Sequence, residues 1–344
     1  MTTRWVSMSK VLITGGCGFV GTNLLPLLKD EGHDVVIVDN LSQSVYVSEF
    51  HDRAKFYEED IRNAKELQDI FNIEKPDVVF HFGGLVSIYD CHNHPVEAAT
   101  NNIVGSINVF EAALQAGCER VIFSETSAVY ENVDLPEDGY KEDTSDPTTF
   151  YAASKASVAL IADSFARTRG LKYTALRYFN IAGPIQDYKR TVPPLFAGFA
   201  LRLLGGNNPI VFGDGTRRRD FIHVDDVNRF HLQCLTDDRT VNETFNLGMA
   251  SSHSLHEIGT IIFEYLRDEV TLDYLEYDQM DEINGEAHTI FANIEKAKAI
   301  GWVPEKTIQD AIFDTIDYLK KEIESGNVNP SDFMKDLDTS KVKI

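Results

Sequence analysis

The segment Lys10–Gly21, which reads KVLITGGCGFVG, decides the fold. Lys10–Thr14 has the apolar run of a buried strand, glycines follow three residues apart, and Phe19–Glu31 has the pattern of a helix. Such a strand–loop–helix is typical of a dinucleotide-binding unit, in which the glycines allow a tight turn, close approach of a pyrophosphate and close packing of helix on strand. The helix points its amide groups and positive dipole end at the phosphates. The candidate cofactor-binding residues here are Gly15, Gly18, Phe19, Val20 and Gly21.

A carboxylate stands at the end of the next apolar run. Asp34–Val38 is predicted as a second strand, and Asp39 follows it, 18 residues after Gly21. A carboxylate at this place accepts hydrogen bonds from the adenosine ribose and repels a 2′-phosphate, so the sequence favours NAD over NADP. The pair Asp60-Ile61 follows another short strand and is a candidate contact for the adenine edge, with a helix cap as the alternative.

Strand-like and helix-like segments alternate through the first half of the chain. This order predicts a parallel sheet with helices on both faces, whose strands are buried on both sides and therefore read as continuous apolar runs. The predicted fold class is α/β, a Rossmann-type doubly wound parallel sheet with a smaller mixed C-terminal substrate lobe. The further predicted strands are 77–80, 120–124 and 173–179, and the further predicted helices are 64–71, 95–116 and 150–169.

Three regions are predicted along the chain. Residues 8–182 form an NAD-binding Rossmann domain, to which later segments return. Residues 183–325 form mainly a substrate-binding lobe, because prolines and glycine turns loosen the alternating pattern there. Residues 326–344 are largely polar and are predicted to be a loosely ordered tail.

Composition excludes several classes of protein. The chain has 344 residues and a formal net charge of −22, and a surface this acidic repels a phosphate backbone, so no nucleic-acid partner is expected. No apolar run reaches the roughly 18–20 residues that cross a bilayer, and the N-terminus does not read as a secretory signal. The four cysteines lack the spacing of a metal site or a disulfide framework. We therefore expect a cytoplasmic protein with no membrane anchor and no bound metal.

Tyr151 and Lys155 stand four residues apart at the start of the predicted helix 150–169, so they project from one face. A tyrosine ordinarily titrates near pH 10, which is too high for a base at neutral pH. A lysine ammonium and a positive nicotinamide ring both stabilise the phenolate and lower its pKa. Tyr151 is therefore the candidate proton acceptor for a sugar hydroxyl, and Lys155 also holds the nicotinamide ribose. For this pair alone, a solvated helix face is the alternative.

Small hydroxyl side chains end the predicted strand 120–124. Ser124 and Thr126 stand at the carboxyl end of a parallel strand, which is where ligands bind in such sheets. Thr126 is the candidate hydroxyl that bonds the reacting sugar oxygen, and Ser124 is a candidate cofactor contact. An ordinary polar turn is the alternative for both.

Together these motifs resemble the extended short-chain dehydrogenase/reductase family, specifically nucleotide-sugar epimerases of the UDP-glucose 4-epimerase type. The resemblance covers roughly residues 10–320. The segments that carry it are Gly15–Gly21, Asp39-Asn40, Asp60-Ile61, His81–Gly84, Asn101 with Gly105–Ala113, Thr126–Tyr130, Tyr151–Lys155, Arg177–Asn180, Gly213–Phe221, Val224–Val227, Leu247-Gly248 and Gly301–Pro304.

The resemblance implies that NAD stays bound while carbon 4 of a nucleotide-linked sugar, foremost a UDP-sugar, is oxidised to a ketone. Tyr151 takes the hydroxyl proton, the nicotinamide takes the hydride, and the keto sugar turns over and is reduced from its other face. The resemblance also implies a homodimer joined through the helices 95–116 and 150–169. The cofactor contacts that it adds are Asn40, Phe82, Gly83, Gly84, Asn101 and Tyr178, and the substrate contacts beside Thr126 are Ser87, Asn180 and Arg219.

The chain departs from the family pattern at several places. Glu131 follows Tyr130 where the family usually has glycine, and Glu125 is an unusual charge beside the site. Gly83-Gly84 stands where alanines are common. A second diphosphate-binding arginine is missing, because Ile283-Asn284 precede Gly285-Glu286, and the identity of the nucleotide is therefore left open. His288 as its substitute and Ile290 as the residue that limits sugar size are looser correspondences.

Rival activities of the same fold remain as alternatives. A 4,6-dehydratase resembling this chain has an Asp-Glu pair directly after the threonine, and a decarboxylase commonly has Ser-Glu, whereas this chain has Ser127-Ala128. A reductase that consumes NADPH is opposed by Asp39. A dinucleotide-sensing protein without enzymatic activity typically loses the tyrosine or the lysine, and this chain keeps both.

Overall fold

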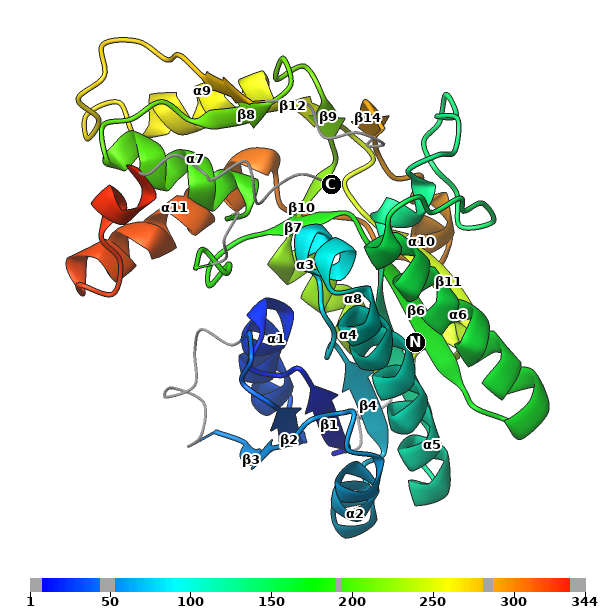
Figure 1. Ribbon diagram of the computed structural model, residues 1–344. Helices are drawn as coiled ribbons and strands as arrows, with labels where there is room; N and C mark the ends of the chain where they lie inside the picture. The colour runs from blue at the N-terminus through cyan, green and yellow to red at the C-terminus, as the bar shows by residue number, and fades with distance from the viewer. Residues whose placement is uncertain (1–7, 44–52, 190–192, 281–286, 335–344) are drawn as a thin grey trace.

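The computed structural model describes residues 8–43, 53–189, 193–280 and 287–334. Its centre is a seven-stranded sheet in the order β11-β6-β5-β4-β1-β2-β3 (Figure 1). Every neighbouring pair in this sheet is parallel, so the predicted Rossmann-type α/β fold is confirmed. The strands are β1 Lys10–Thr14, β2 Asp34–Asp39, β3 Lys55–Glu58, β4 Val78–His81, β5 Arg120–Thr126, β6 Tyr173–Tyr178 and β11 Glu243–Leu247.

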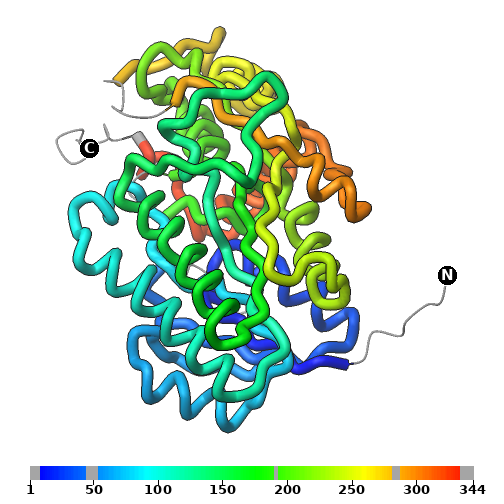
Figure 2. The backbone as a smooth tube through the Cα atoms, turned by 90° about the vertical axis from the view of Figure 1, so that its right-hand side faces the viewer, coloured from blue at the N-terminus to red at the C-terminus, as the bar shows by residue number. Residues whose placement is uncertain are grey.

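Helices cover both faces of the sheet because alternate strand residues point to opposite sides. In β1, Val11 and Ile13 belong to one core cluster, with side chains of α1 and α8. Leu12, between them, belongs to the other cluster, with side chains of α2, α5 and α6. Figures 1 and 2 show α5 and α6 side by side over this second face. The helices are α1 Phe19–Asp30, α8 Val224–Thr236, α2 Ala64–Glu74, α5 Ser106–Ala116 and α6 Phe150–Arg169.

The predicted continuous helix 95–116 is wrong in its middle turn. The segment consists of α4 Pro95–Ala99, the π-helical turn η1 Thr100–Gly105 and then α5. The wider turn accompanies an inward Asn102, whose Nδ2 donates to the Leu85 carbonyl at 3.0 Å and to Ser154 Oγ at 3.0 Å. Its Oδ1 accepts from the Leu85 N–H at 2.7 Å. These long-range bonds tie the helix to the cavity wall, and π-turns are frequent at functional sites.

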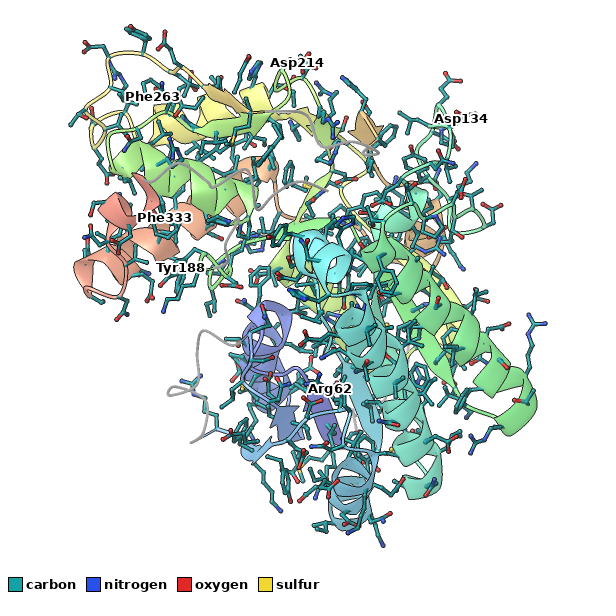
Figure 3. All side chains as sticks on the ribbon, viewed as in Figure 1. Arg62, Asp134, Tyr188, Asp214, Phe263 and Phe333 are labelled. Carbon is teal, nitrogen blue, oxygen red and sulfur yellow. The ribbon has the colours of Figure 1, made fainter. Side chains whose placement is uncertain are left out.

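A second lobe has its own core. Side chains of α7, α9 and α11 pack together around buried residues such as Phe196, Ile258 and Ile312. Figure 3 labels Tyr188, Phe263 and Phe333 in this lobe. Its elements are α7 Leu195–Leu204, α9 Leu255–Tyr265 and α11 Ile308–Glu324, with β8 Ile210–Phe212, β9 Arg218–Arg219, β12 His253–Ser254, β13 Asp278–Met280 and β14 Thr289–Ile290.

Short elements join the two lobes. β7 and β10 form a two-stranded parallel pair beyond the carboxyl end of β6. The remaining elements are β7 Asn180–Ala182, β10 Phe221–His223, α3 Ile88–Asn93, α10 Glu295–Ala299 and the 3₁₀ turns η2 Ser127–Tyr130, η3 Asp238–Thr240 and η4 Pro330–Met334.

The start of the predicted loose tail is packed. Val328 is buried in the core of the second lobe, and the Arg202 guanidinium donates to the Phe333 carbonyl at 3.1 Å. Residues 335–344 lie outside the described residues. The division at 182–183 and 325–326 stays a prediction, although α8 and β11 from the later half do pack into the first sheet layer.

Candidate active site

A cavity of about 560 Å³ opens at the carboxyl ends of the central strands, between the sheet and the second lobe. It brings together every residue predicted for the site except Gly21, Asp60 and Ser87. The predicted residues that line it are Gly15, Gly18, Phe19, Val20, Asp39, Asn40, Ile61, Phe82, Gly83, Gly84, Asn101, Ser124, Thr126, Tyr151, Lys155, Tyr178, Asn180 and Arg219.

The glycine loop has the geometry that a pyrophosphate requires. Gly15 has φ +67°, and a Cβ built on it would lie 2.6 Å from the backbone nitrogen of Gly83. A Cβ on Gly21 would lie 2.6 Å from the Gly16 carbonyl oxygen, so Gly21 serves the packing of α1 against the loop rather than the cavity wall. Gly18 begins α1, and within the described chain no side chain caps this helix. Its first N–H groups are therefore available to an anion.

Asp39 ties the glycine loop to the end of β2. Its two carboxylate oxygens accept from the Cys17 N–H at 3.0 Å and from the Leu41 N–H at 2.8 Å. The side chain is buried except for its cavity face, since Asp39 also lines the cavity. A carboxylate fixed in this way beside the phosphate loop suits the hydroxyls of an adenosine ribose.

Asp60 lies just behind the cavity wall. Its carboxylate accepts from the Arg62 guanidinium at 2.9 and 2.7 Å and from Asn40 Nδ2 at 2.8 Å. The bonds from Arg62, which Figure 3 labels, lower the pKa of Asp60 to about 2. Asp60 thus orients Asn40, while Ile61 contributes the apolar wall. Its direct contact with an adenine stays a prediction.

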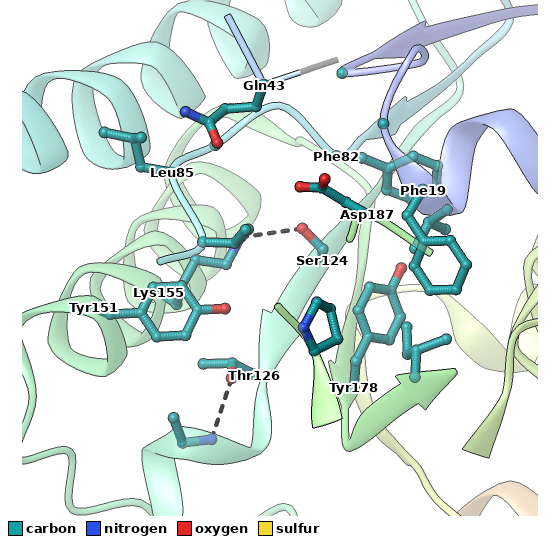
Figure 4. A pocket seen from close by; sticks show the side chains of 18 of the residues that line it. Phe19, Gln43, Phe82, Leu85, Ser124, Thr126, Tyr151, Lys155, Tyr178 and Asp187 are labelled. Carbon is teal, nitrogen blue, oxygen red and sulfur yellow. Dashed lines mark hydrogen bonds between the residues drawn. The ribbon is translucent and has the colours of Figure 1, made fainter. Parts of the chain in front are cut away.

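Tyr151 and Lys155 come from the first turns of α6. The Lys155 ammonium donates to Ser124 Oγ at 3.0 Å, which joins α6 to β5 (Figure 4). Burial lowers the pKa of Lys155 from its ordinary value to about 8, against the opposing effect of the Glu125 carboxylate. Figure 4 shows the Tyr151 hydroxyl pointing into the cavity, with Lys155 on one side and Thr126 on the other. The Lys155 ammonium and the Tyr151 phenol therefore lie side by side in the part of the cavity that Ser124 and Thr126 also line.

Thr126 ends β5 and begins the turn η2. Its Oγ1 accepts from the Ala128 N–H at 3.2 Å, as the cap of that turn. Because the oxygen already accepts a bond, the hydroxyl proton can be donated to a ligand. Thr126 therefore suits a partner that carries an oxygen lone pair, such as the reacting oxygen of a sugar.

Tyr178 lies across the cavity and differs from Tyr151 in its chemistry. Its hydroxyl lies 2.7 Å from His231 Nε2, and His231 Nδ1 lies 3.0 Å from Asn228 Oδ1. Burial raises the pKa of Tyr178 well above its ordinary value and lowers that of His231 to about 3. A neutral histidine that donates through Nδ1 accepts a hydrogen bond from the Tyr178 hydroxyl through Nε2. Tyr178 therefore forms part of the cavity wall, where His231 fixes its orientation, and does not act as a base.

Asn101 contributes a hydrogen-bond acceptor to the cavity wall. Asn101 Oδ1 is buried and, among the described residues, makes no hydrogen bond. Asn101 also lines the cavity, so a donor on a bound molecule would satisfy this oxygen. With the glycine loop, Asp39 and the apolar Phe82 and Ile61, this acceptor makes the described residues fit NAD.

The predicted substrate contacts divide into two groups. Asn180 and Arg219 line the cavity, and the Arg219 guanidinium donates to the carbonyls of Arg218 and Ala287, each at 3.0 Å. Ser87 instead accepts from the Asp90 N–H at 3.1 Å as the cap of α3 and lies off the cavity wall. The hydrogen bond that Ser87 makes stabilises the start of α3, and its contact with a substrate stays a prediction.

The looser correspondences also have places in the structure. Ile290 lines the cavity, whereas His288 is exposed and bonds Thr216 Oγ1 at 3.3 Å. Ile283, Asn284, Gly285 and Glu286 lie outside the described residues.

Several wall residues are missing from the predicted site because, apart from Phe221 at the end of the segment Gly213–Phe221, no quoted motif contains them. They come from the second lobe, from loops and from the turn after β5. These residues are Gln43, Leu85, Val86, Ile88, Glu131, Gln186, Asp187, Pro194, Leu195, Phe196 and Phe221. Only Glu131 carried a signal, as a charge where a glycine is usual, and that signal did not reveal its partners.

The described residues contain neither a membrane-spanning helix nor a cluster of metal-ligating side chains. No helix there is long and apolar enough to cross a membrane. No group of three or more His, Cys, Asp or Glu side chains gathers there as a metal site would require.

Known proteins resemble this chain over most of its length. A putative UDP-glucose 4-epimerase of Methanocaldococcus jannaschii is 30% identical over 90% of this chain and 98% of that protein. The crystal structure of a UDP-glucose 4-epimerase from Thermotoga maritima with UDP-glucose has a TM-score of 0.86 at 30% identity, covering 91% of this chain and 99% of that one. A Thermus thermophilus UDP-glucose 4-epimerase complex with NAD has a TM-score of 0.82 at 27% identity, covering 90% and 99%.

The pattern of one family spans the whole first sheet layer. The NAD dependent epimerase/dehydratase family matches residues 11–248, from β1 through the strand β11 at the sheet edge. That range holds the glycine loop, Asp39 and the pair Tyr151 and Lys155. By this match, and by relatives at 30% identity over nearly its full length, the chain belongs to the NAD dependent epimerase/dehydratase family.

Proposed function

We propose that this protein inverts carbon 4 of a UDP-hexose, with Tyr151 as the acid and base. Its relatives and its family make it an NAD-dependent nucleotide-sugar 4-epimerase. One observation carries the assignment of residues: Tyr151, Lys155, Ser124 and Thr126 line the same cavity as the glycine loop. A proton acceptor and a dinucleotide cradle therefore face one shared space, as reversible oxidation of a hydroxyl requires.

The proposed proton transfer uses groups that line the same cavity. Tyr151 accepts the proton of the sugar 4-hydroxyl while Lys155, held on Ser124, stabilises the phenolate by its charge. Thr126 keeps its proton and donates a hydrogen bond to the same sugar oxygen as this oxygen becomes a carbonyl. When bound, NAD would serve as the acceptor of the hydride from carbon 4 and, in its reduced form, as the donor of that hydride to the opposite face of the ring. Tyr151 then gives its proton back, so the protein ends each turnover unchanged.

Inversion requires the sugar to turn while the nucleotide stays anchored. We propose that Asn180 and Arg219, on the second-lobe side, hold the nucleotide and the diphosphate. Arg219 suits a diphosphate because a guanidinium presents several donors in one plane. The cavity is lined partly by apolar side chains such as Leu85 and Phe196, which allow a ring to rotate without breaking fixed hydrogen bonds.

Uridine is proposed as the base because the relative from Thermotoga maritima was solved with UDP-glucose. A dehydratase or decarboxylase is disfavoured by the turn after Thr126, where Ser127-Ala128 supply no acid. The neighbouring Glu125 is no substitute: its Oε2 accepts from the Arg177 guanidinium at 2.6 Å, in a buried ion pair.

We also propose a homodimer through α4, the π-turn η1 and α6. Val96 is 80% exposed and Leu160 74% exposed, and an apolar hollow lies nearby on the same helices. That hollow is lined by Pro95, Val96, Ala99, Thr100, Ile103, Val104 and Phe150. An apolar face of this kind suits a second copy of the chain, whose size-exclusion or light-scattering mass tests the idea. The cytoplasmic location stays a prediction.

A substrate panel tests the activity. Purified protein is incubated separately with UDP-glucose, UDP-galactose and the GDP-, dTDP- and CDP-hexoses, and products are identified by proton NMR. We expect UDP-glucose and UDP-galactose to interconvert to the same final ratio from either side, without added reductant. A 4-keto-6-deoxy product, or turnover only with NADPH, would contradict the proposal. Conversion restricted to another nucleotide would contradict uridine alone.

A further inference from the structure

Glu131 is a buried carboxylate that the proposed chemistry does not use. It follows the turn η2, is 8% exposed and lines the cavity. Its Oε2 accepts from the Thr148 N–H at 3.0 Å and from the Thr149 N–H at 2.8 Å. Its Oε1 accepts from the Thr149 hydroxyl at 3.0 Å. Three donors from one short segment therefore converge on one carboxylate.

Those donors stand at the start of the helix that carries Tyr151. Thr149 is the N-cap of α6, and its Oγ1 accepts from the Ala152 N–H at 3.2 Å. The Thr149 hydroxyl thus accepts from the helix and donates to Glu131, which makes a continuous chain of bonds into the first turn. Tyr151 lies inside that turn, two residues after the cap. The negative charge of Glu131 also suits the positive end of the helix dipole.

The other side of Glu131 is fixed to the strand that carries Thr126. The Glu131 N–H donates to the Ala128 carbonyl at 3.1 Å, and Ala128 in turn donates to Thr126 Oγ1. Glu131 is therefore a short bridge between β5 and α6, the elements that bring Thr126 and Tyr151 to the same sugar oxygen. Seventeen residues separate Glu131 from Thr148 in sequence. A glycine at this position would leave the bridge absent.

We propose that Glu131 is a positioning residue for turnover, which sets the placement of Tyr151 relative to Thr126 by clamping the N-cap of α6. This inference rests on the proposed function. A misplacement of reacting groups by about 1 Å can cost about 10²-fold in rate, so a clamp on the first turn of α6 acts on kcat. The nucleotide is held elsewhere, by the second-lobe side, so KM for the UDP-sugar should change little.

A carboxylate matches the three donors better than an amide does. Ionised Glu has two acceptor oxygens and no donor, whereas Gln has one acceptor oxygen and an NH₂ group. In Glu131→Gln, the amide oxygen can keep the two backbone N–H groups, but the NH₂ group then faces the Thr149 hydroxyl. That hydroxyl loses its acceptor yet keeps its bond to Ala152. Glu131→Ala removes both acceptor oxygens, and with them all three hydrogen bonds, and leaves two backbone N–H groups without their partner.

The test compares the kinetics and stability of four variants with those of the original protein. We expect kcat to fall about 10- to 100-fold in Glu131→Ala and about fivefold in Glu131→Gln, with KM for UDP-galactose within about twofold of the original protein. Glu137→Ala is the matched control, because this exposed carboxylate lies in the same loop. Asn132→Ala is the structural control, since it removes a 2.7 Å bond to Asp146 that closes the loop without touching α6.

A pH profile separates positioning from a general loss of stability. If Tyr151 drifts from Lys155, its phenolate is less stabilised, so the acid limb of kcat/KM should move to higher pH in Glu131→Ala and return toward the original in Glu131→Gln. Asn132→Ala should lower Tm without moving that limb. A kcat for Glu131→Ala within twofold of the original, or an acid limb at the same pH in Glu131→Ala and Asn132→Ala, would overturn the proposal.

Two outcomes remain distinct from failure of the epimerase assignment. If the unchanged protein interconverts UDP-glucose and UDP-galactose but Glu131→Gln has full kcat, the positioning role is wrong and the function stands. If Glu131→Ala does not fold, Glu131→Gln decides alone, by a reduced kcat at an unchanged Tm. If the unchanged protein gives no epimer, the function itself fails first.

Discussion

Backbone groups form one end of the cavity, around the glycine loop, and side chains form the other, around Tyr151 and Lys155. At the cofactor end, the backbone shapes the site: Gly15 is at positive φ against Gly83, and the start of α1 offers bare N–H groups. At the sugar end, side chains from separate elements meet, with Lys155 of α6 on Ser124 of β5 at 3.0 Å. One end is fixed by local chain geometry, and the other by the register between a strand and a helix.

Because the two ends are built differently, substitutions at each end should change a different measured quantity. Adding atoms at the cofactor end obstructs a bound molecule, so it should act on affinity for NAD. Changing a group at the sugar end alters proton transfer or its alignment, so it should act on turnover while NAD remains bound. If the two ends are independent, a variant at one end should change NAD affinity or turnover, but not both.

The largest effect is expected for Tyr151→Phe. Removal of the phenol oxygen takes away the proposed proton acceptor, and general acid–base catalysis contributes roughly 10²–10⁴-fold. We expect kcat to fall about 10³-fold while NAD, measured in the supernatant of denatured protein, stays at its original occupancy. Tyr274→Phe, at a side chain that is 66% exposed, is the control. Near-normal kcat in Tyr151→Phe would remove the proposed acid and base.

The next effect is expected for Gly15→Ala at the other end. The new Cβ would lie 2.6 Å from the Gly83 nitrogen, and the residue would also be held at positive φ. Strain of this kind costs about 1–3 kcal/mol, so affinity for NAD should fall roughly 10- to 100-fold if the loop shifts to relieve it. Titration of NAD-free protein with NAD measures this loss.

Gly32→Ala is the matched control for that variant. Gly32 also has positive φ, at +85°, but nothing lies within 4 Å of a Cβ built on it. It should lower the free energy of unfolding by about 1 kcal/mol and leave affinity for NAD unchanged. Equal losses of affinity in both variants would mean that backbone strain, and not obstruction at the loop, governs the cofactor end.

The same division explains how much the sequence could predict. The predicted helix Phe19–Glu31 is α1 Phe19–Asp30, and the predicted strand Asp34–Val38 is β2 Asp34–Asp39. Both depend on neighbours in sequence: apolar runs, glycine spacing and a terminal carboxylate. The pairing of Tyr151 with Lys155 was equally accessible, because residues four apart share one helix face.

The remainder depends on contacts between distant residues. The π-turn η1 goes with bonds from Asn102 to Leu85 and to Ser154, at separations of 17 and 52 residues. The bond from Glu131 to Thr148 likewise has no periodicity that a pattern could reveal. The second-lobe wall, which includes Leu195 and Phe196, depends on how that lobe packs over the sheet, and no motif in the sequence contains these two residues.

A smaller effect is expected from pH at the sugar end. Lys155 has a pKa of about 8, below its ordinary value of 10.5, because burial disfavours its charge. The ammonium is therefore present below pH 8 and lost above it, so kcat/KM should fall about tenfold per pH unit above that point. Lys155→Arg keeps a charge that does not titrate in this range and should abolish the limb.

The sign for stability is opposite to that for activity. A depressed pKa means that the folded protein disfavours the ammonium, so the unfolded chain binds more protons between about pH 8 and 10.5. The free energy of unfolding of the NAD-free protein should therefore rise with pH through this window, relative to that of Lys155→Met.

The activity prediction has its own contradicting outcome. An alkaline limb of kcat/KM that persists unchanged in Lys155→Arg would assign the loss of activity to another group.

The smallest effect is expected for Ser124→Ala, which removes the acceptor of the Lys155 ammonium but neither charge nor phenol. One hydrogen bond to a charged group is worth about 1.5–3 kcal/mol at most, and water in the open cavity can replace part of it, so kcat should fall about fivefold. NAD occupancy should stay near its original value, since the glycine loop is untouched. Ser127→Ala, at the residue directly after Thr126, is the matched hydroxyl control. A loss of NAD in Ser124→Ala as large as in Gly15→Ala would show that the two ends are not separable, because Lys155 would then serve the cofactor as much as the sugar.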